Sequence, residues 1–442
     1  MTASHSDWVD LYDASLLILA STLSWTRRSH PESQERGRAV GASRYPKINM
    51  TNSSMGAAKA AKNDEFYTQW ADIEREINAY LEYDPDLFRD KVLLLPCDDP
   101  EWSNFTKFFA LHFGDFGLKK LISTSYAPDS NPAKADYQPT LFEVEDPKFD
   151  ETKTHANGKI FTLTADDMNA DGVIDIHDLN WDYLEGDGDF RSTEVTALRD
   201  DSDVVITNPP FSLFRQFMAW LLEADKKFAV IGNSNALTYA QVFPLVKENR
   251  LWKGATANTT DMVFGVPKGA AVKEADRAKA ERMGYPSDEQ RDYTRLGNSC
   301  WFTNIDHGRR HEPMQLMTVA DNLRFNKKLI KKLDGATGYF RYDNYDAIEV
   351  PYTDAIPSDF DGVMGVPITF LDKYNPDQFE IVGTNRYTIP HGMTQKFVDD
   401  YYASGQKGQI HEGHPDLCYY DTQGRPVVTY DRILIRHREA AS

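Results

Sequence analysis

Residues 203–211, which read DVVITNPPF, decide the fold of this chain. The stretch begins as an apolar run typical of a buried strand and stops abruptly at two consecutive prolines. The following residues predict a helix over 213–224, with Ser212 as its N-cap, and then a buried strand over 228–231. Strand, helix and strand form a βαβ unit. Its first strand carries the turn 208–211 at its carboxyl end, where open α/β sheets bind ligands.

The turn carries groups that can activate an amino nitrogen. An exocyclic amino nitrogen on a base is a poor nucleophile because its lone pair is delocalised into the ring. Two acceptors aimed at its hydrogens would draw it toward tetrahedral geometry. The side-chain oxygen of Asn208 and the backbone carbonyl of Pro209 can serve, because Pro209 and Pro210 have a fixed φ and no N–H. Phe211 offers a flat face on which the target ring can stack. The pattern predicts methyl transfer from a sulfonium donor through electrostatic positioning, the alternative being an ordinary proline turn.

A second strand-to-loop junction lies upstream and suits the methyl donor. Residues 91–95 (KVLLL) predict a buried parallel strand, and a polar turn with two carboxylates follows it. The next helix is predicted to begin at Ser103 and Asn104, so that its amino end faces the same edge of the sheet. The turn lacks the glycine-rich sequence usual in methyltransferases. The predicted donor contacts here are Cys97, Asp98, Asp99, Ser103 and Asn104.

Two further segments complete the predicted donor site. In the segment EGDGDF, Asp189 can accept a hydrogen bond from the adenine amino group of the donor, and Phe190 can pack on the adenine ring. A flexible acidic loop is the alternative. In the segment NDEFYT, Tyr67 and Thr68 precede a predicted helix over 72–80 and can close over the methionine end of the donor.

Charge is unevenly distributed along the chain. The formal net charge is −19, whereas contacts with nucleic-acid phosphates usually require a basic face. Acidic residues greatly outnumber basic ones in an insert-like region at about 143–203. The densest basic run falls on a predicted helix over 319–333, ended by Gly335, with an apolar face formed by Leu323, Phe325, Leu329, Ile330 and Leu333. Its other face is a candidate for phosphate contact, a solvated face being the alternative, and consists of Arg324, Lys327, Lys328, Lys331 and Lys332.

Composition bounds the class of protein. With 442 residues and 41% hydrophobic content, the chain can form two or three domains with full cores. Its three cysteines are too few for a disulfide framework, so a reducing cytoplasm is expected. The longest apolar run, residues 16–23, is too short to cross a membrane and follows acidic residues, so no membrane or export segment is predicted. Residues 1–55 are interpreted as a disordered extension or a start-site artefact.

Residues 167–178 match a calcium loop. Oxygen ligands at alternating positions, with a glycine at the sharp turn, are what a hard cation needs. The ligands at positions 1, 3, 5, 9 and 12 would be Asp167, Asn169, Asp171, Asp175 and Asp178. We expect a structural ion, the alternative being an acidic surface turn. A calcium-dependent binding module centred on this loop is a further alternative. It would predict two copies of the loop, but the sequence contains a single copy.

These segments, in this order, resemble the gamma arrangement of N6-adenine DNA methyltransferases, and more specifically the EcoRI-type adenine-specific DNA methyltransferase family. The resemblance extends from about residue 60 to the end of the chain. It implies an S-adenosylmethionine-dependent enzyme that flips an adenine out of duplex DNA and methylates its N6 atom. The segments that carry it are NDEFYT at 63–68, CDDPEWSNF at 97–105, GDGDFRS at 186–192, NPPFSLF at 208–214, GNSCWFTNID at 297–306, GVPITFLDKYNP at 365–376 and RILIRHR at 432–438.

The resemblance also implies an architecture and partners. A Rossmann-like α/β methyltransferase sheet is expected over residues 56–310, followed by an α+β target-recognition domain over 311–442. Trp301 and Phe302, on a predicted late strand, are candidates for the wall of the target-base pocket, although large aromatic residues on strands more often belong to the core. Expected partners are double-stranded DNA and a restriction endonuclease that acts on the same site without a stable complex. Because the same tetrapeptide serves N6-adenine methylation of RNA and glutamine methylation of proteins, these substrates are the alternatives.

Overall fold

The computed structural model describes residues 66–100, 103–130, 139, 144–167, 179–256, 261–388 and 392–438. The chain divides into two units, Met1–Met50 and Thr51–Ser442, and every described residue belongs to the second. The extension expected at residues 1–55 lies outside the described residues. Within the described ranges, no helix is long and apolar enough to cross a membrane.

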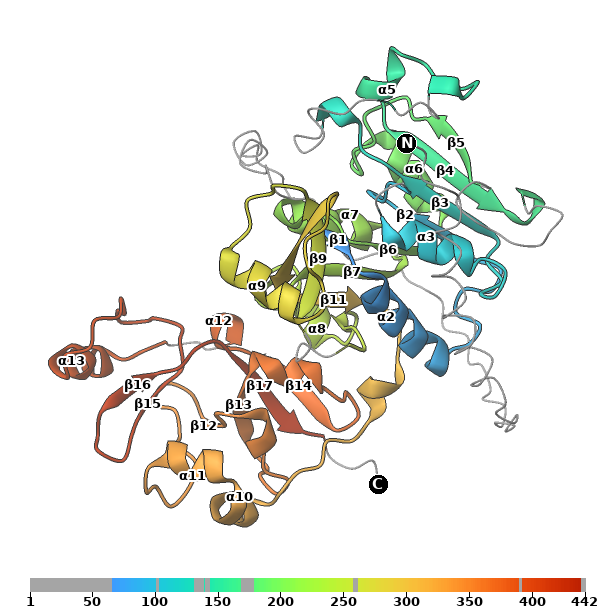
Figure 1. Cartoon of the computed structure of the whole chain (residues 1–442). Helices are drawn as coiled ribbons and strands as arrows, with labels where there is room; N and C mark the ends of the chain where they lie inside the picture. The colour runs from blue at the N-terminus through green and yellow to red at the C-terminus, as the bar shows by residue number, and fades with distance from the viewer. Residues whose placement is uncertain are drawn as a thin grey trace, which may run out of the picture. The chain divides into compact units, whose positions relative to one another are not determined.

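The largest sheet has eight strands in the order β5–β4–β3–β2–β6–β7–β11–β8 (Figure 1). Its four central strands are parallel, and the two strands at each edge pair antiparallel with their neighbours. The chain passes from β2 to β3 on one side and from β6 to β7 on the other, so the strand order reverses between β2 and β6. The bounds are β2 Val92–Leu95, β3 Lys120–Thr124, β4 Lys159–Thr164, β5 Asn180–Tyr183, β6 Val204–Thr207, β7 Lys227–Asn233, β8 Trp252–Lys253 and β11 Ser299–Thr303.

The central strands are unbroken apolar runs because both faces of the sheet are covered. Successive side chains of a strand point to opposite faces. Leu94 and Val205 therefore enter one core cluster, whereas Leu93 and Val204 enter a second cluster. Strands covered on both faces lack the polar alternation of half-exposed ones, so KVLLL and DVVIT could be recognised as parallel strands from the sequence. The pairing of β2 with β6 confirms that prediction.

Helices cover the two faces. The side chains of α2 and α3 pack in the second cluster, and those of α6 and α7 pack in the first. The acidic insert contributes the edge strands β4 and β5 and the short helix α5, so it extends the sheet. The helix bounds are α2 Trp70–Tyr83, α3 Asn104–Leu111, α5 Lys153–Ala156, α6 Thr193–Asp201, α7 Phe214–Glu223 and α8 Phe243–Lys247.

The predicted βαβ unit is present as β6–α7–β7, with β6 and β7 parallel. The prediction that Ser212 caps its helix is wrong. A 3-10 turn, η6 Phe211–Leu213, precedes α7, and Leu213 is the N-cap. The backbone N–H of Leu213 bonds to the carbonyl of Pro210 at 3.0 Å, which closes a tight turn before the helix can begin.

A small antiparallel sheet, in the order β1–β9–β10, adjoins the large one. Tyr67 of β1 is paired with Gly265 and Thr68 with Phe264, across nearly two hundred residues of sequence. Tyr67 and Thr68 precede a helix, as predicted, which is α2; the strand that they form was not predicted. The bounds are β1 Tyr67–Thr68, β9 Met262–Pro267, α9 Glu274–Arg282 and β10 Arg291–Leu296.

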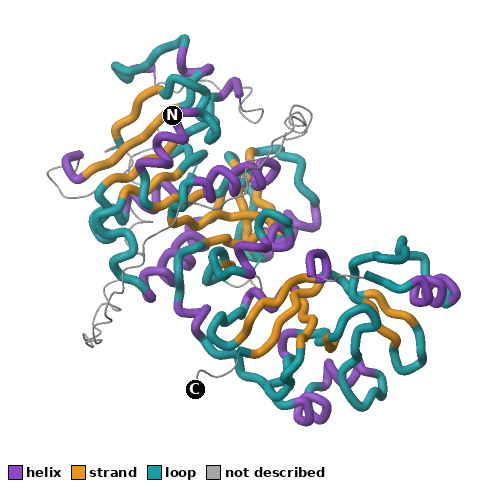
Figure 2. The backbone as a smooth tube through the Cα atoms, turned by 180° about the vertical axis from the view of Figure 1, so that it is seen from behind, coloured by secondary structure: helices purple, strands orange, loops and turns teal. Residues whose placement is uncertain are grey.

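The C-terminal part contains a mixed four-stranded sheet in the order β12–β13–β17–β14 and a two-stranded hairpin, whose strands are labelled in Figure 1. Figure 2 shows the strands of this part from behind, in orange. β12 pairs parallel with β13, and the other pairs are antiparallel. The bounds are α10 Val319–Phe325, α11 Lys327–Leu333, β12 Ala347–Glu349, β13 Val363–Pro367, β14 Phe379–Thr384, α12 Asn385–Thr388, α13 Gln395–Ala403, β15 Cys418–Tyr420, β16 Pro426–Val428 and β17 Arg432–His437.

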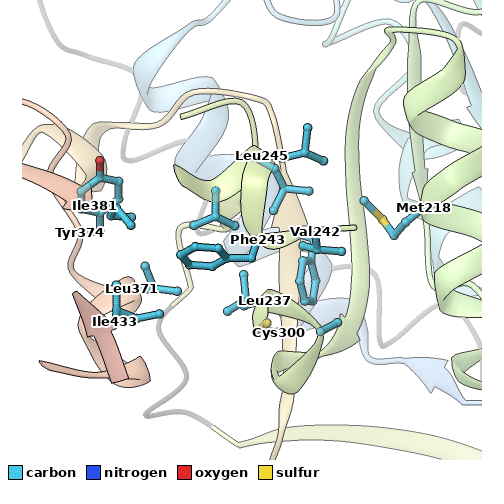
Figure 3. Close-up of a cluster of buried hydrophobic side chains, with 14 of the residues drawn as sticks. Met218, Leu237, Val242, Phe243, Leu245, Cys300, Leu371, Tyr374, Ile381 and Ile433 are labelled. Carbon is cyan, nitrogen blue, oxygen red and sulfur yellow. The ribbon is translucent and has the colours of Figure 1, made fainter. Parts of the chain in front are cut away.

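One hydrophobic cluster joins this sheet to the large one. Phe243 and Leu245 of α8 belong to the same cluster as Ile381 of β14 and Ile433 of β17 (Figure 3). A buried ion pair between Lys253 of β8 and Asp372 adds a polar link. The two sheets therefore share a core.

The single basic helix predicted over 319–333 is wrong, because the chain forms two helices, α10 and α11, that meet at Asn326. Asn326 has φ −80° and ψ 91°, and its side chain accepts a hydrogen bond from the backbone N–H of Leu329 as an N-cap. The break turns part of the expected apolar face outward. Phe325 is 57% exposed and Ile330 is 41% exposed, whereas Leu329 is buried.

Candidate active site

Two strand ends meet where the strand order of the large sheet reverses. β2 ends before the polar turn at Cys97 and Asp98, and β6 ends before Asn208. The ends are tied together because the hydroxyl of Thr207 donates to the carbonyl of Pro96 at 2.6 Å. In open α/β sheets this reversal point is where ligands bind.

The side chain of Asn208 is held by one end only. Its Nδ2 atom donates to the backbone carbonyl of Phe66 at 2.5 Å. Its Oδ1 atom is buried and has no hydrogen-bond partner among the residues that the structure describes. A buried acceptor without a partner costs free energy, about 1–3 kcal/mol in typical proteins, so its presence points to a ligand that donates to it. Of the two acceptors expected at the turn, this one is fixed and unoccupied by the protein.

Phe211 lies against two other aromatic rings. Its ring centroid is 5.3 Å from that of Phe66 and 6.2 Å from that of Phe264, at interplanar angles of 53° and 83°. The centroids of Phe66 and Phe264 are 6.0 Å apart, so the three rings form a triangle. Phe211 remains only partly buried. The contacts fix the orientation of its ring and leave part of it for a substrate.

Asp98 is the most deeply buried carboxyl group of the site, at 4% exposure. Its Oδ1 atom accepts a hydrogen bond from the Ser103 hydroxyl at 2.6 Å, and its Oδ2 atom is buried without a partner. Burial raises the pKa of Asp98 to about 7, although the hydroxyls of Ser103 and Thr207 act in the opposite direction. Ser103 also caps α3 by accepting from the backbone N–H of Phe105 at 3.1 Å, as the sequence predicted.

The segment before α2 joins these two strand ends. Asn104, the first residue of α3, donates through Nδ2 to the carbonyl of Thr68 at 2.8 Å. The Thr68 hydroxyl is buried and has no partner. Within the described part of the chain, Thr68, Asp98 and Asn208 thus each keep a buried polar atom without a partner. Asp98 and Asn208 belong to the turns after β2 and β6, and Thr68 is bonded to the start of α3. These atoms form a set that can accept or donate to a polar ligand.

Cys97 and Asp99 complete the turn after β2. Cys97 has a positive φ of 67°, which non-glycine residues rarely adopt and which marks a sharp change of chain direction. Burial, together with Asp98 and Asp189, raises the pKa of its thiol, so the sulfur stays protonated and is no nucleophile. Asp99 accepts the backbone N–H of Ser103 through its carbonyl at 2.7 Å.

The side chains of Asp189 and Phe190 are engaged by the protein. Burial would raise the pKa of Asp189, but hydrogen bonds from Arg191 outweigh burial and lower it, so Asp189 is ionised. Its Oδ1 atom accepts from the backbone N and the Nε of Arg191, both at 2.8 Å. Phe190 is buried against Phe217 and Trp220, with centroids 5.0 and 5.6 Å away. This ring belongs to the core, so it does not offer a face to the donor in this structure.

Trp301 and Phe302 also belong to the core. Both lie on β11, as predicted, at 1% and 0% exposure. Trp301 packs edge-on against Phe105 in one cluster, and Phe302 packs against Phe214 in the other. Neighbouring residues of a strand face opposite sides of the sheet, so the two rings cannot line one pocket. We therefore leave them out of the target-base pocket.

Two other sets of candidate residues were predicted from the sequence. The basic residues Arg324, Lys327, Lys328, Lys331 and Lys332 are all exposed on α10 and α11. Of the predicted calcium loop, only Asp167 lies within the described residues; Asn169, Asp171, Asp175 and Asp178 fall outside them. The carboxylate of Asp167 accepts hydrogen bonds from Thr164 and Asn180. Among the described residues, no group of three or more His, Cys, Asp or Glu side chains could hold a metal ion.

Phe66 and Phe264 were missed by the sequence analysis. Phe66 stands inside the segment NDEFYT, but only its neighbours Tyr67 and Thr68 were singled out. Phe264 lies within an apolar run that carries no local sign of a site. An aromatic residue directly before two predicted donor contacts was the one available signal.

An open α/β sheet with an Asn-Pro-Pro-Phe turn beside an unpartnered buried acceptor defines an amino-group methyltransferase. The family model described as adenine-specific methyltransferase EcoRI matches residues 54–438. The chain is 39% identical over 338 residues to the type II methyltransferase M.EcoRI of Escherichia coli, which covers 76% of this chain and 90% of that protein. It is 34% identical over 353 residues to the type II methyltransferase M.MpnI of Mycoplasma pneumoniae, covering 80% of this chain and 92% of that protein.

A third relative, the type II methyltransferase M.MgeORF184P of Mycoplasma genitalium, is 33% identical over 344 residues, which are 77% of this chain and 90% of the relative. No solved structure matches the chain significantly. The chain belongs to the EcoRI family of adenine-specific methyltransferases and is a DNA adenine methyltransferase of the restriction–modification type.

Proposed function

We propose that this enzyme transfers a methyl group from S-adenosylmethionine to N6 of an adenine within a specific site of double-stranded DNA. The observation that carries the proposal is the buried, unpartnered Oδ1 atom of Asn208 at the end of β6. An acceptor in that state suits an amino group that has hydrogens to donate and little basicity of its own. The carboxamide oxygen, the proline carbonyl and the aromatic ring all lie within the four residues 208–211, which favours one planar amino-substituted ring as the target.

Each residue of the turn has its own role in the proposed reaction. The Oδ1 atom of Asn208 accepts one N6 hydrogen and the carbonyl of Pro209 accepts the other, which concentrates electron density on nitrogen. The ring of Phe211 stacks on the adenine and holds it in the plane that these acceptors require. S-adenosylmethionine supplies a methyl group on a sulfonium, so that a C–N bond forms as the C–S bond breaks and N6 afterwards loses a proton. The turn itself needs no basic side chain before attack.

The residues present fit the donor. The Thr68 hydroxyl and the Oδ2 atom of Asp98 are buried without partners, and a molecule with an amino-acid part and ribose hydroxyls can satisfy both. We propose that Tyr67, Thr68, Asp98, Asp99 and Asn104 hold it, with Cys97 and Ser103 shaping the turn. We include Asp189 because its carboxylate is near enough to Cys97 of the same turn to raise the pKa of that thiol. The Asp189 carboxylate also forms an ion pair with Arg191.

We further propose that the sheet of residues 92–303 is Rossmann-like and that residues 311–442 form the target-recognition domain. The parallel centre, with strand order reversing between β2 and β6, supports the first point. The second sheet and the exposed basic residues of α10 and α11 support the second, since contacts with phosphates require cations. A restriction endonuclease would act on the same site without a stable complex.

A structural calcium ion at residues 167–178 remains a prediction, tested by calcium titration of Asp171→Asn beside the wild type.

The proposal is tested with radiolabelled S-adenosylmethionine supplied to plasmid DNA, ribosomal RNA and a panel of proteins. Label should enter DNA and be recovered as N6-methyladenine. Asn208→Ala should lower the rate by about 10²–10³-fold, as the loss of one transition-state hydrogen bond typically does, while donor binding survives. The neighbouring Ser212→Ala, at an exposed position of η6, is the matched control. Label in RNA or protein and not in DNA, or full turnover by Asn208→Ala, would refute the proposal.

A further inference from the structure

Amide side chains are symmetric in shape, so an asparagine that must present its oxygen needs something to fix its orientation. If the Asn208 amide were turned over, its NH2 group would face the amino group of the substrate, donor against donor, and activation would be lost. The backbone carbonyl of Phe66 lies 2.5 Å from the Nδ2 atom of Asn208. A carbonyl can only accept, so it selects the nitrogen and directs the oxygen to the other side.

Building on the proposed function, we propose that the backbone of Phe66 is a positioning element of the reaction, because its carbonyl fixes the Asn208 amide in the orientation that presents oxygen to the target amino group. The same residue positions the stacking ring. The side chain of Phe66 contacts Phe211 at 5.3 Å between centroids, and Phe264 supports both rings. One residue thus orients the acceptor through its backbone and the aromatic face through its side chain.

The position of Phe66 is itself fixed by β1. On one edge this strand pairs with β9, through Tyr67 and Thr68. In addition, side-chain amides bind each carbonyl in turn. Asn208 binds that of Phe66, Gln69 that of Tyr67 at 3.0 Å, and Asn104 that of Thr68 at 2.8 Å. Carbonyls of alternate residues in an extended strand point the same way, so Phe66 and Thr68 direct theirs toward the two active-site turns.

β1 therefore connects the acceptor site with the donor site. Asn104 begins α3, which follows the turn at Asp98, and Asn208 follows β6. The carbonyls of Thr68 and Phe66, which these two amides bind, are only two residues apart on one extended segment. The Thr68 hydroxyl, buried without a partner, lies on this strand between the two sites. Occupation of the donor site is expected to tighten the hold on Asn208.

The substitution Asn208→Asp tests the proposal, because aspartate keeps the acceptor oxygen and replaces the NH2 group, which donates to the Phe66 carbonyl, by a second oxygen. Only the protonated carboxyl can donate to that carbonyl while its other oxygen accepts from the substrate. The rate of Asn208→Asp relative to the wild type should be about 10²-fold low at pH 8 and should rise as pH falls, by up to about tenfold per pH unit while the carboxyl is mostly ionised.

Other groups near the turn also titrate or carry charge: Cys97, Asp98 and Asp99 after β2, Tyr67 on β1, Arg291 of β10 on the ring of Tyr67, and Arg215 of α7. The wild type shares all of them, so taking the ratio of the two rates removes their direct effect. Asn208→Ala, which can neither donate nor accept, is the control and should show a ratio that does not change with pH. A flat ratio for Asn208→Asp at any level, including full activity, would overturn the proposal.

The wild-type protein gives a second measurement that does not depend on the folding of a variant. In a nitrogen–proton correlation spectrum, the Asn208 amide is identified as the NH2 pair absent from Asn208→Ala. One of its protons should be shifted downfield and should exchange with solvent at least about tenfold more slowly than the amide of the exposed Asn235. An unshifted, fast-exchanging pair would contradict the proposal. A wild-type enzyme that leaves DNA unmethylated would instead refute the proposed function, so the two failures are distinguishable.

Discussion

At the scale of single residues, Asp98 is a buried carboxyl group that lowers stability and that we propose to contact the methyl donor. Its side chain is buried at the end of β2, and one of its two oxygens has no partner. Burial raises the pKa to about 7, so near neutral pH the group exchanges readily between its protonated and ionised forms. A ligand that donates to the free oxygen would favour the ionised form. If Asp98 holds the donor as proposed, donor binding should depend on pH near neutrality.

Asp98→Asn should remove a pH dependence of stability. The folded-state pKa of about 7 lies above the unfolded value of 3.8, so the native state binds more protons between these values. Wild-type stability without donor should therefore fall as pH rises from about 4 to about 7, at up to about 1.4 kcal/mol per unit. The variant lacks this loss. In urea denaturation at several pH values, the free energy of unfolding of the variant minus that of the wild type should increase across that range. The difference should become constant above pH 7. Parallel curves would contradict the pKa of this carboxyl.

At the scale of elements, the small sheet β1–β9–β10 supports the turn 208–211, which we propose to be catalytic. Phe264 of β9 is fully buried, and its ring contacts both Phe66 and Phe211. The pairing of β1 with β9 brings residues 67 and 265 into register. Distant strands thus build the wall behind Phe211, and the turn depends on a strand of only two residues.

Phe264→Leu should reduce turnover more than its loss of stability suggests. The smaller side chain leaves a gap behind Phe211, so the stacking ring loses its fixed orientation. Phe228→Leu, at an equally buried phenylalanine of β7, is the matched control. Both variants should lose about 1 kcal/mol of stability in urea denaturation. Only Phe264→Leu should lower kcat, by about tenfold, because the ring of Phe211 no longer holds the target base in place. Equal kcat values in the two variants would show that the aromatic contact is merely structural.

At the scale of the whole molecule, a strongly acidic chain must still bind DNA. The net charge is −19, yet five basic residues lie exposed together on α10 and α11. Of these, Lys328 forms an ion pair with Asp354 at 3.3 Å. The shared hydrophobic cluster and the buried pair of Lys253 and Asp372 tie the C-terminal sheet to the catalytic one. Contacts made by one part can therefore orient DNA for the other.

Lys331→Ala and Lys332→Ala should each weaken DNA binding and reduce its salt dependence. Each phosphate contact that is lost should lower the slope of log K against log salt concentration by about 1. Lys119→Ala is the control because this exposed lysine lies just before β3, at the amino ends of the parallel strands. The site lies at their carboxyl ends. Fluorescence anisotropy with a labelled duplex at several salt concentrations measures the slope. If the lysines of α11 behave like Lys119, they belong to a solvated helix face.

Local features of the sequence predicted much of the catalytic half. The apolar runs at β2 and β6, the proline turn and the cap at Ser103 depend on neighbouring residues, and the structure confirms these elements. The helix over 319–333 was wrong because a side-chain cap at Asn326 competes with helix continuation, and hydrogen bonds to Asn322 and Asp354 decide between them. The roles proposed for Phe190, Trp301 and Phe302 depended on exposure, which periodicity does not give.

The sequence by itself determined the central strands β2, β6 and β7, the turn at residues 208–211 and the groups able to activate an amino nitrogen, because these depend on residue type and close neighbours. Only the tertiary structure decided which atom of the Asn208 amide the protein binds and which it leaves for the proposed substrate. That choice belongs to the carbonyl of Phe66, 142 residues away, and no local pattern records it. The physical reason is that an amide has two nearly identical orientations, and a partner brought by the fold selects one of them.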